Sequence, residues 1–154
     1  MRYILLILSI GFLLSCSTQS KSSNMETSEG KPKTESNTIA NRLHDIWALE
    51  EISNQKIEEI GVFIRRPQLE IFVKDKRVVG NDGCNQFSGS IKELNETQII
   101  FGPLMKTEIA CEKENISKKF NIALYETQTY KREGLKLYLL DAEGIELLQF
   151  QKID

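Results

Sequence analysis

From residue 39 to the C-terminus, apolar and polar residues mostly alternate, the pattern of antiparallel strands with one buried face. The clearest example is segment 86–92, where Phe87, Gly89 and Ile91 are predicted to face inward and the residues between them to face water. Asn81-Asp82-Gly83 has the composition of a tight turn with positive φ. Strands are predicted at 47–49, 68–73, 77–80, 86–92, 97–101, 128–131, 135–140 and 145–151.

One segment has the period of a helix instead. After Cys111, apolar residues recur at helical spacing and predict one amphipathic helix. Asn115 is a candidate N-cap for it, with 112–114 as an alternative start. The last two strands carry apolar residues on both faces, so each face is expected to be covered or to lie against a partner or ligand. The expected fold is α+β, a curved antiparallel sheet packed around that helix. The helical stripe consists of Ile116, Phe120, Ala123, Leu124 and Thr127.

The N-terminus has the organisation of a bacterial lipoprotein signal. Arg2 precedes an apolar run, residues 3–14, that is too short to span a bilayer as a helix. The run ends in Leu-Leu-Ser-Cys, which resembles a lipobox and makes Cys16 the expected lipidation site. Two alternatives are an ordinary cleaved signal peptide with an incidental cysteine and an uncleaved anchor. The sequence thus divides into a signal peptide with its lipobox cysteine (1–16), a disordered polar tether (17–40) and a folded domain (41–154).

Lipidation would place the domain in the bacterial cell envelope, attached to the membrane and facing the periplasm. Ser17 after the cysteine resembles the default sorting signal for the outer membrane. Removing Arg2 with the signal peptide changes the formal net charge from -2 to -3, and no basic stripe is present along the mature chain. Nucleic acid is therefore excluded as an expected partner. We expect a monomer that contacts the membrane through its lipid and an envelope protein or an apolar small molecule through its domain.

The two remaining cysteines form an even pair. With Cys16 acylated, Cys84 and Cys111 are expected to form a disulfide in an oxidising compartment. The alternatives are two buried free thiols or a redox pair. A redox pair is disfavoured because the Cys-x-x-Cys spacing that lowers a thiol pKa is missing.

Two motifs in the folded domain are specific. Residues 80–89 have the pattern G-x-x-G-C-N-x-F-x-G, and residues 107–111 have the pattern T-x-I-A-C, with Ile109 at the third position. They resemble the two motifs of a known family, the META domain of HslJ-like heat-inducible bacterial lipoproteins, in which methionine is usual at the position of Ile109. The resemblance runs from Trp47 nearly to the C-terminus. It implies a partial β-barrel wrapped on a helix, and an envelope role linked to heat stress and aminocoumarin resistance. It implies no established catalytic activity.

A search for catalytic residues finds little. His44 is the only histidine, and a catalytic role would require it to reach a distant nucleophile, so we interpret it as an exposed residue. No cofactor site or cluster with metal-ligand spacing is recognised. Asn85 and Thr107 are the candidate binding residues, although Asn85 is first expected to bond turn backbone and Thr107 to cap a local turn. The favoured function is a non-enzymatic interaction or stress-protection protein; the alternative is small-molecule or lipid binding in the mouth of the barrel.

Overall fold

The computed structural model describes residues 38–39, 41–111 and 116–153. Cys16, the expected tether up to residue 37 and the candidate N-cap Asn115 lie outside the described residues. Within the described residues, no helix is both long and apolar enough to cross a membrane.

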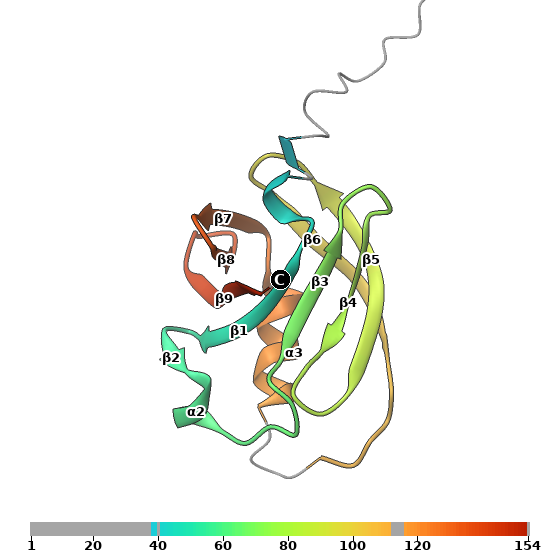
Figure 1. Ribbon diagram of the computed structural model, residues 1–154, viewed down its shortest axis with the longest axis vertical. Coiled ribbons are helices and arrows are strands. Elements are labelled where there is room, and N and C mark those ends of the chain that lie inside the picture. The colour runs from blue at the N-terminus through green and yellow to red at the C-terminus, as the bar shows by residue number, and fades with distance from the viewer. Residues whose placement is uncertain (1–37, 40, 112–115, 154) are drawn as a thin grey trace, which may run out of the picture.

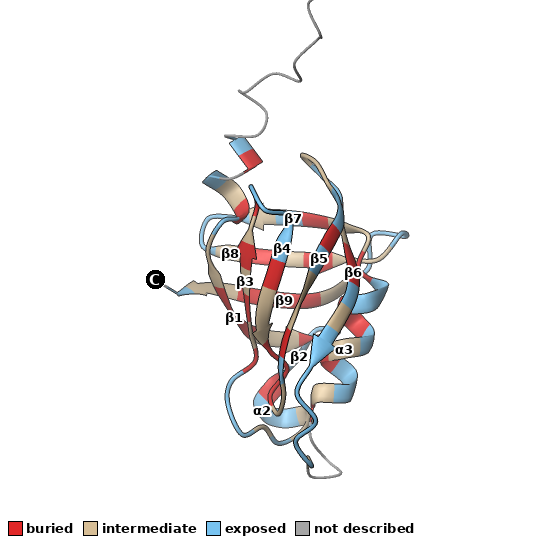
Figure 2. Cartoon of the chain, turned by 90° about the vertical axis from the view of Figure 1, so that its right-hand side faces the viewer, coloured by how far each residue is buried: buried red, intermediate tan, exposed pale blue. Residues whose placement is uncertain are grey.

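The main structure is one curled antiparallel sheet (Figure 1). Its strands follow the order β6-β5-β4-β3-β1-β9-β8-β7, and the short β2 pairs with β1. Figure 2 shows β7, β8 and β9 running across the direction of β3, β4 and β5, as expected for a strongly twisted sheet. The strands are β1 (Ile46–Ile52), β2 (Gln55–Lys56), β3 (Gln68–Phe72), β4 (Arg77–Asn81), β5 (Gln86–Leu94), β6 (Ile99–Lys106), β7 (Thr129–Glu133), β8 (Lys136–Leu140) and β9 (Glu146–Ile153).

The two edge strands approach each other at one end, which makes the sheet a partial barrel. A bridge joins Gln98 to Thr129, and the Tyr130 backbone N–H donates to the Thr97 carbonyl at 2.9 Å. Helix α3 (Ser117–Glu126) connects β6 to β7 and packs against β9, β6 and β1. The expected α+β architecture, a curved sheet or partial barrel around one helix, is confirmed.

The interior of the barrel is filled by side chains. Phe120 of α3 lies 5.9 Å from the Phe87 ring and 6.4 Å from the Phe150 ring, measured between centroids. Trp47 is completely buried, and its indole N–H donates to the Leu43 carbonyl at 3.1 Å. Because these large rings come from β1, β5, β9 and α3, one core joins both halves of the sheet to the helix.

Two positions in the 80–89 segment require glycine for specific structural reasons. A Cβ at Gly80 would lie 2.1 Å from the Gln68 carbonyl oxygen, so only glycine permits this approach of β4 to β3. Gly83 has a φ of +97°, and a Cβ there would meet Phe63, Pro67 and Ile116 at 3.1 to 3.3 Å. The glycine-rich motif is therefore an architectural requirement, and the predicted positive-φ turn is present.

The chain before β1 also contributes to the core. Residues 38–39 and 41–43 are helical, and Ile39 and Leu43 are buried. The Arg132 guanidinium donates to the Asn41 and Arg42 carbonyls, both at 2.9 Å, and so ties this segment to β7. The packed structure thus includes Ile39, just before the boundary expected at residue 41.

Three features differ from the sequence prediction. The hairpin of β1 with β2 and the short helix α2 (Ile57–Ile60) were not predicted. Strand β6 continues beyond residue 101 to Lys106, through Pro103. The outer apolar positions of the last two strands, Tyr138, Leu140 and Leu147, are half-buried, in line with the expected covering of both faces, whereas Leu135 and Ile145 are exposed.

Candidate functional site

The 80–89 motif and the 107–111 motif lie next to each other at the end of the domain where β4 turns into β5. Cys84 and Cys111 form a disulfide with a Cα–Cα distance of 6.0 Å. The bond attaches the end of the 107–111 segment, which follows β6, to the turn between β4 and β5. The structure thus joins the two cysteines that the sequence pairs.

Asn85 holds the same segment through its side chain. Its Oδ1 accepts from the Ile109 backbone N–H at 2.8 Å and from the Thr107 hydroxyl at 3.0 Å. Its Nδ2 lies 3.4 Å from the Cys111 Sγ. The expectation that Asn85 bonds turn backbone is therefore wrong, because its side chain points across to a distant segment. Thr107 likewise caps no local turn: its Oγ1 accepts from the Gln86 backbone N–H at 3.1 Å on the neighbouring strand.

The turn backbone is held by Asp82, a residue that the sequence reasoning placed in the turn without a separate role. Its Oδ1 accepts from the backbone N–H groups of Cys84 at 3.1 Å and Asn85 at 2.7 Å. Its Oδ2 accepts from the Asn121 amide of α3 at 2.7 Å. Asp82 is 1% exposed, so these bonds satisfy a buried carboxylate and fix the helix relative to the turn.

The mouth of the barrel gives little room for the expected ligand. Trp47, Phe87, Phe101 and Phe120 are each at most 5% exposed and belong to one core cluster. A small molecule in the interior would have to displace these side chains. This observation counts against the alternative of small-molecule or lipid binding in the barrel.

A larger hollow lies on the outer face of the sheet. It is an open groove of about 710 Å³ across β3, β4, β5 and β6, beside the turn that Asp82 holds. The outward-facing strand residues beneath this groove lie in two rows set by the strand register, and we call these two rows the groove floor. The first row is Gln68, Asn81 and Gln86, continued by Thr107, and the second is Glu70, Val79, Ser88 and Met105.

Three cations line the groove. The Arg66 side chain already has partners within the protein, because its guanidinium donates to the Leu49 carbonyl at 2.9 Å and to the Glu58 carboxylate. Arg65 and Lys106 are exposed, and their side chains make no hydrogen bond or ion pair with other described residues. With Glu70 as the one carboxylate in the lining, the groove has an excess of positive charge, although the whole chain is acidic.

Two smaller hollows are less suited to binding. One of about 270 Å³ is lined by charged residues that pair with each other: Lys136 with Glu50 at 3.3 Å, and Arg66 with Glu58. Another of about 300 Å³ lies beside α3 and combines Ile122 and Leu147 with Lys119 and Glu126. Charge is neutralised or mixed in both.

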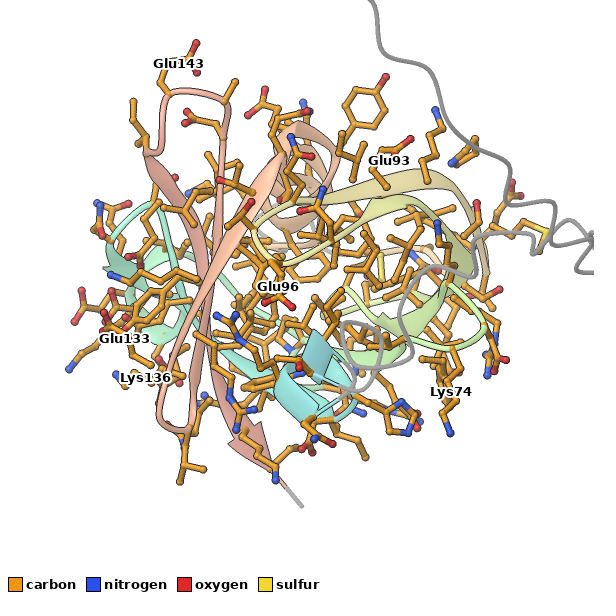
Figure 3. The ribbon with its side chains drawn as sticks, turned by 90° about the horizontal axis from the view of Figure 1, so that it is seen from above. Lys74, Glu93, Glu96, Glu133, Lys136 and Glu143 are labelled. Carbon is orange, nitrogen blue, oxygen red and sulfur yellow. A yellow bond between two sulfur atoms is a disulfide. The ribbon has the colours of Figure 1, made fainter. Side chains whose placement is uncertain are left out.

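The described residues contain no cluster of three or more His, Cys, Asp or Glu side chains arranged to hold a metal ion. His44 is exposed near the start of β1, with its ring edge-on to Phe72 at 5.7 Å. It therefore lies near the β3–β4 hairpin and not beside the disulfide. Figure 3 shows the Lys74 side chain of that hairpin pointing away from the domain.

Of the predicted site residues, the structure brings Cys84, Asn85, Thr107 and Cys111 together, with Thr107 at the border of the groove. Arg65, Lys106 and the groove-floor residues other than Thr107 were not among the predicted site residues. Only one signal was available: alternation placed Gln86 and Ser88 on the outer face. Their neighbours on adjacent strands depend on the strand register, which the alternation of apolar and polar residues does not determine.

The fold is similar to those of solved proteins with low sequence identity. An NMR structure of one protein matches with a TM-score of 0.55 at 18% identity, covering 72% of this chain and 91% of that one. An NMR structure of a protein from Burkholderia xenovorans matches with a TM-score of 0.54 at 17% identity, covering 88% and 99%. These likenesses concern the fold alone.

No curated protein matches the chain significantly. The family comparison covers most of the chain: residues 39–154 match the model of the META domain. The match begins at buried Ile39 and includes both motifs held together by the disulfide. The chain therefore belongs to the META domain family.

Proposed function

We propose that this META protein is a lipid-anchored, non-enzymatic envelope protein that binds another protein through the outer groove. The proposal rests on where the protein has space for a binding partner. The interior is filled by the core, whereas the large hollow lies outside and opens to solvent. A packed barrel with an open, charged outer groove suits surface recognition better than enclosure of a small ligand.

The stress-protection part of the proposal comes from the family resemblance, and the envelope part from the lipobox around Cys16. Acylation of Cys16 by more than one chain would hold the protein at the membrane. The groove would then face the periplasm on a tether, where it could reach envelope proteins. Protection against heat or aminocoumarins would follow from that binding.

The test is chemical cross-linking in heat-stressed envelopes followed by identification of captured proteins. The test variant is Arg65→Glu/Lys106→Glu, which reverses both free cations of the groove. The matched control is Lys74→Glu/Lys118→Glu, which makes the same charge change at exposed residues outside the groove lining. We expect a defined set of proteins with the wild type and the control, and its loss with the groove variant.

The same variants test the physiological role. A strain lacking the protein should grow less well under heat or aminocoumarin treatment, and the wild type and the control should restore growth. The groove variant should not. A groove variant that captures the same proteins and restores growth fully would contradict the proposal.

A further inference from the structure

We infer that the groove binds an extended acidic peptide segment that carries an apolar residue, with its carboxylates at Arg65 and Lys106. This inference rests on the protein-binding function proposed above and names the chemistry of the partner. It comes from the charge, the groove floor and the apolar side chains at or near the groove, taken in turn.

The two free cations belong to segments next to the two outer strands of the groove. Arg65 precedes β3, whereas Lys106 ends β6, and β4 and β5 lie between them. Three strand spacings separate β3 from β6, about 14 Å. About four residues of extended chain span this distance, so acidic side chains near both ends of such a segment can reach both cations.

The groove floor offers hydrogen bonds to a peptide backbone. The side chains of Gln68, Gln86 and Ser88 make no hydrogen bond to other described residues. They come from two strands and lie in the two registered rows, facing outward. Amide and hydroxyl groups both donate and accept, which matches the alternating N–H and C=O groups of an extended chain.

Apolar side chains also lie at or near the groove, and its lining contains no accessible aromatic ring. Met105 is 75% exposed, and Ile64 and Ile109 flank the turn, held by hydrogen bonds to Gly83 and Asn85. The one aromatic residue of the lining, Phe87, is 4% exposed and packs on Phe120. A sugar or base would find no stacking platform here, whereas an apolar side chain of a peptide would find contacts.

Glu70 provides an internal check on the charge argument. Its carboxylate lines the groove and makes no hydrogen bond or ion pair with another described residue. An acidic peptide would be repelled by it, so Glu70→Gln should strengthen peptide binding. A gain of affinity cannot be produced by damage to the fold, which makes this variant informative.

The test is fluorescence anisotropy with the full-length protein in non-ionic detergent at physiological ionic strength, where distant charges are screened. The probe is a labelled peptide of about eight residues in which glutamate and serine alternate around one leucine. Matched probes replace every glutamate with glutamine or lysine. Anionic lipid vesicles and an anionic polysaccharide are tested as competitors.

We expect the acidic probe to bind and the other two to bind at least about tenfold more weakly. Arg65→Glu/Lys106→Glu should weaken the acidic probe by about tenfold, and Glu70→Gln should tighten it by about two- to threefold. Lys74→Glu/Lys118→Glu should change it less than about twofold.

Equal binding of the glutamine probe, or unchanged binding to Arg65→Glu/Lys106→Glu, would overturn the inference. So would groove-dependent binding of the vesicles or the polysaccharide without binding of the peptide. If the envelope cross-links depend on the groove but the acidic probe does not bind, only this inference fails. If the probe binds but no groove-dependent cross-link forms in envelopes, the proposed function fails instead.

Discussion

Asn85 joins two segments that are distant along the chain, and its amide makes three contacts with 107–111. The side chain of nearby Asp82 joins the β4–β5 turn to α3 in a similar way. Short polar side chains thus position the disulfide from both sides. Asn85 is a candidate binding residue in the sequence, but in the structure its side chain is already bonded to another segment of the protein.

Replacement of this amide tests that role. Asn85→Ala removes the acceptor for the Ile109 N–H and the Thr107 hydroxyl, so we expect a loss of about 1–2 kcal/mol in the free energy of unfolding. Asn85→Asp keeps an acceptor oxygen and should lose less. Urea denaturation of both variants measures the difference. Equal losses would mean that the contact of Nδ2 with the Cys111 sulfur matters more than the accepted bonds.

Glu146 gives a prediction about pH. Burial raises the pKa of its carboxyl, and nearby Glu51 raises it further. The folded state therefore binds this proton more tightly than the unfolded state, so the contribution of Glu146 to stability falls as pH rises from about 4. Glu146→Gln should increase the free energy of unfolding at pH 7 by about 0.3 kcal/mol, a small effect because the group is partly exposed. Denaturation at pH 3 should show no difference from the wild type.

At the scale of elements, the 107–111 segment is the connection that shapes the groove border. It follows β6 and carries Thr107 next to Gln86 and Cys111 next to Cys84. The last residues of β6 pair only with β5 among the described residues. The disulfide and Asn85 therefore hold this end of the edge strand, including Lys106, in place.

Reduction of the disulfide should lower stability substantially. The two cysteines are separated by 27 positions, and the entropy of the loop they close corresponds to about 3–4 kcal/mol. Cys84→Ser, Cys111→Ser and the double variant should all lose a similar amount. Guanidinium denaturation with and without reductant measures it, and the double variant should no longer respond to the reductant. A wild type that is insensitive to reductant would contradict a stabilising disulfide.

Alternation predicted most strands, since one face of each packs on the core. Strand 86–92 is an example: Phe87 and Ile91 are buried and Gln86 is exposed. The last part of β6 was not predicted because it contains Pro103. Proline breaks most strands but is tolerated in an edge strand such as β6. The hairpin of β1 with β2 turns through Ser53 and Asn54, both with positive φ, and is too short to show a period.

The candidate site was less accessible to sequence reasoning. The pairing of Cys84 with Cys111 follows from counting cysteines, but the groove depends on which residues lie side by side across four strands. A one-residue change of register would bring different side chains into each row. Arg65 lies in an irregular segment where no periodic pattern exists, so only the coordinates place it beside the groove.

At the scale of the whole molecule, the chain enters the domain and the groove opens at different ends. Figure 1 shows residues 38–39 and 41–43 at the top and the β4–β5 turn toward the bottom. Figure 3, seen from above, shows Glu133 and Lys136 at the β7–β8 hairpin, well apart from Lys74. A protein held by its N-terminal end would thus present the Arg65 and Lys106 end of the groove away from the membrane.

In the proposed arrangement, membrane anchoring and folding depend on separate parts of the chain, which Cys16→Ser tests. Cys16 lies more than twenty positions before Ile39, the first residue of the described core, so its replacement should leave the thermal midpoint unchanged within about 1 °C. The same replacement should move the protein from the membrane fraction to the soluble fraction, because the lipid proposed at Cys16 would supply the membrane affinity. Fractionation and intact mass, with the Cys84→Ser variant as a control that keeps its lipid, measure both. A Cys16→Ser protein that stays in the membrane fraction would favour an uncleaved signal anchor, since the apolar segment 3–14 would then be retained.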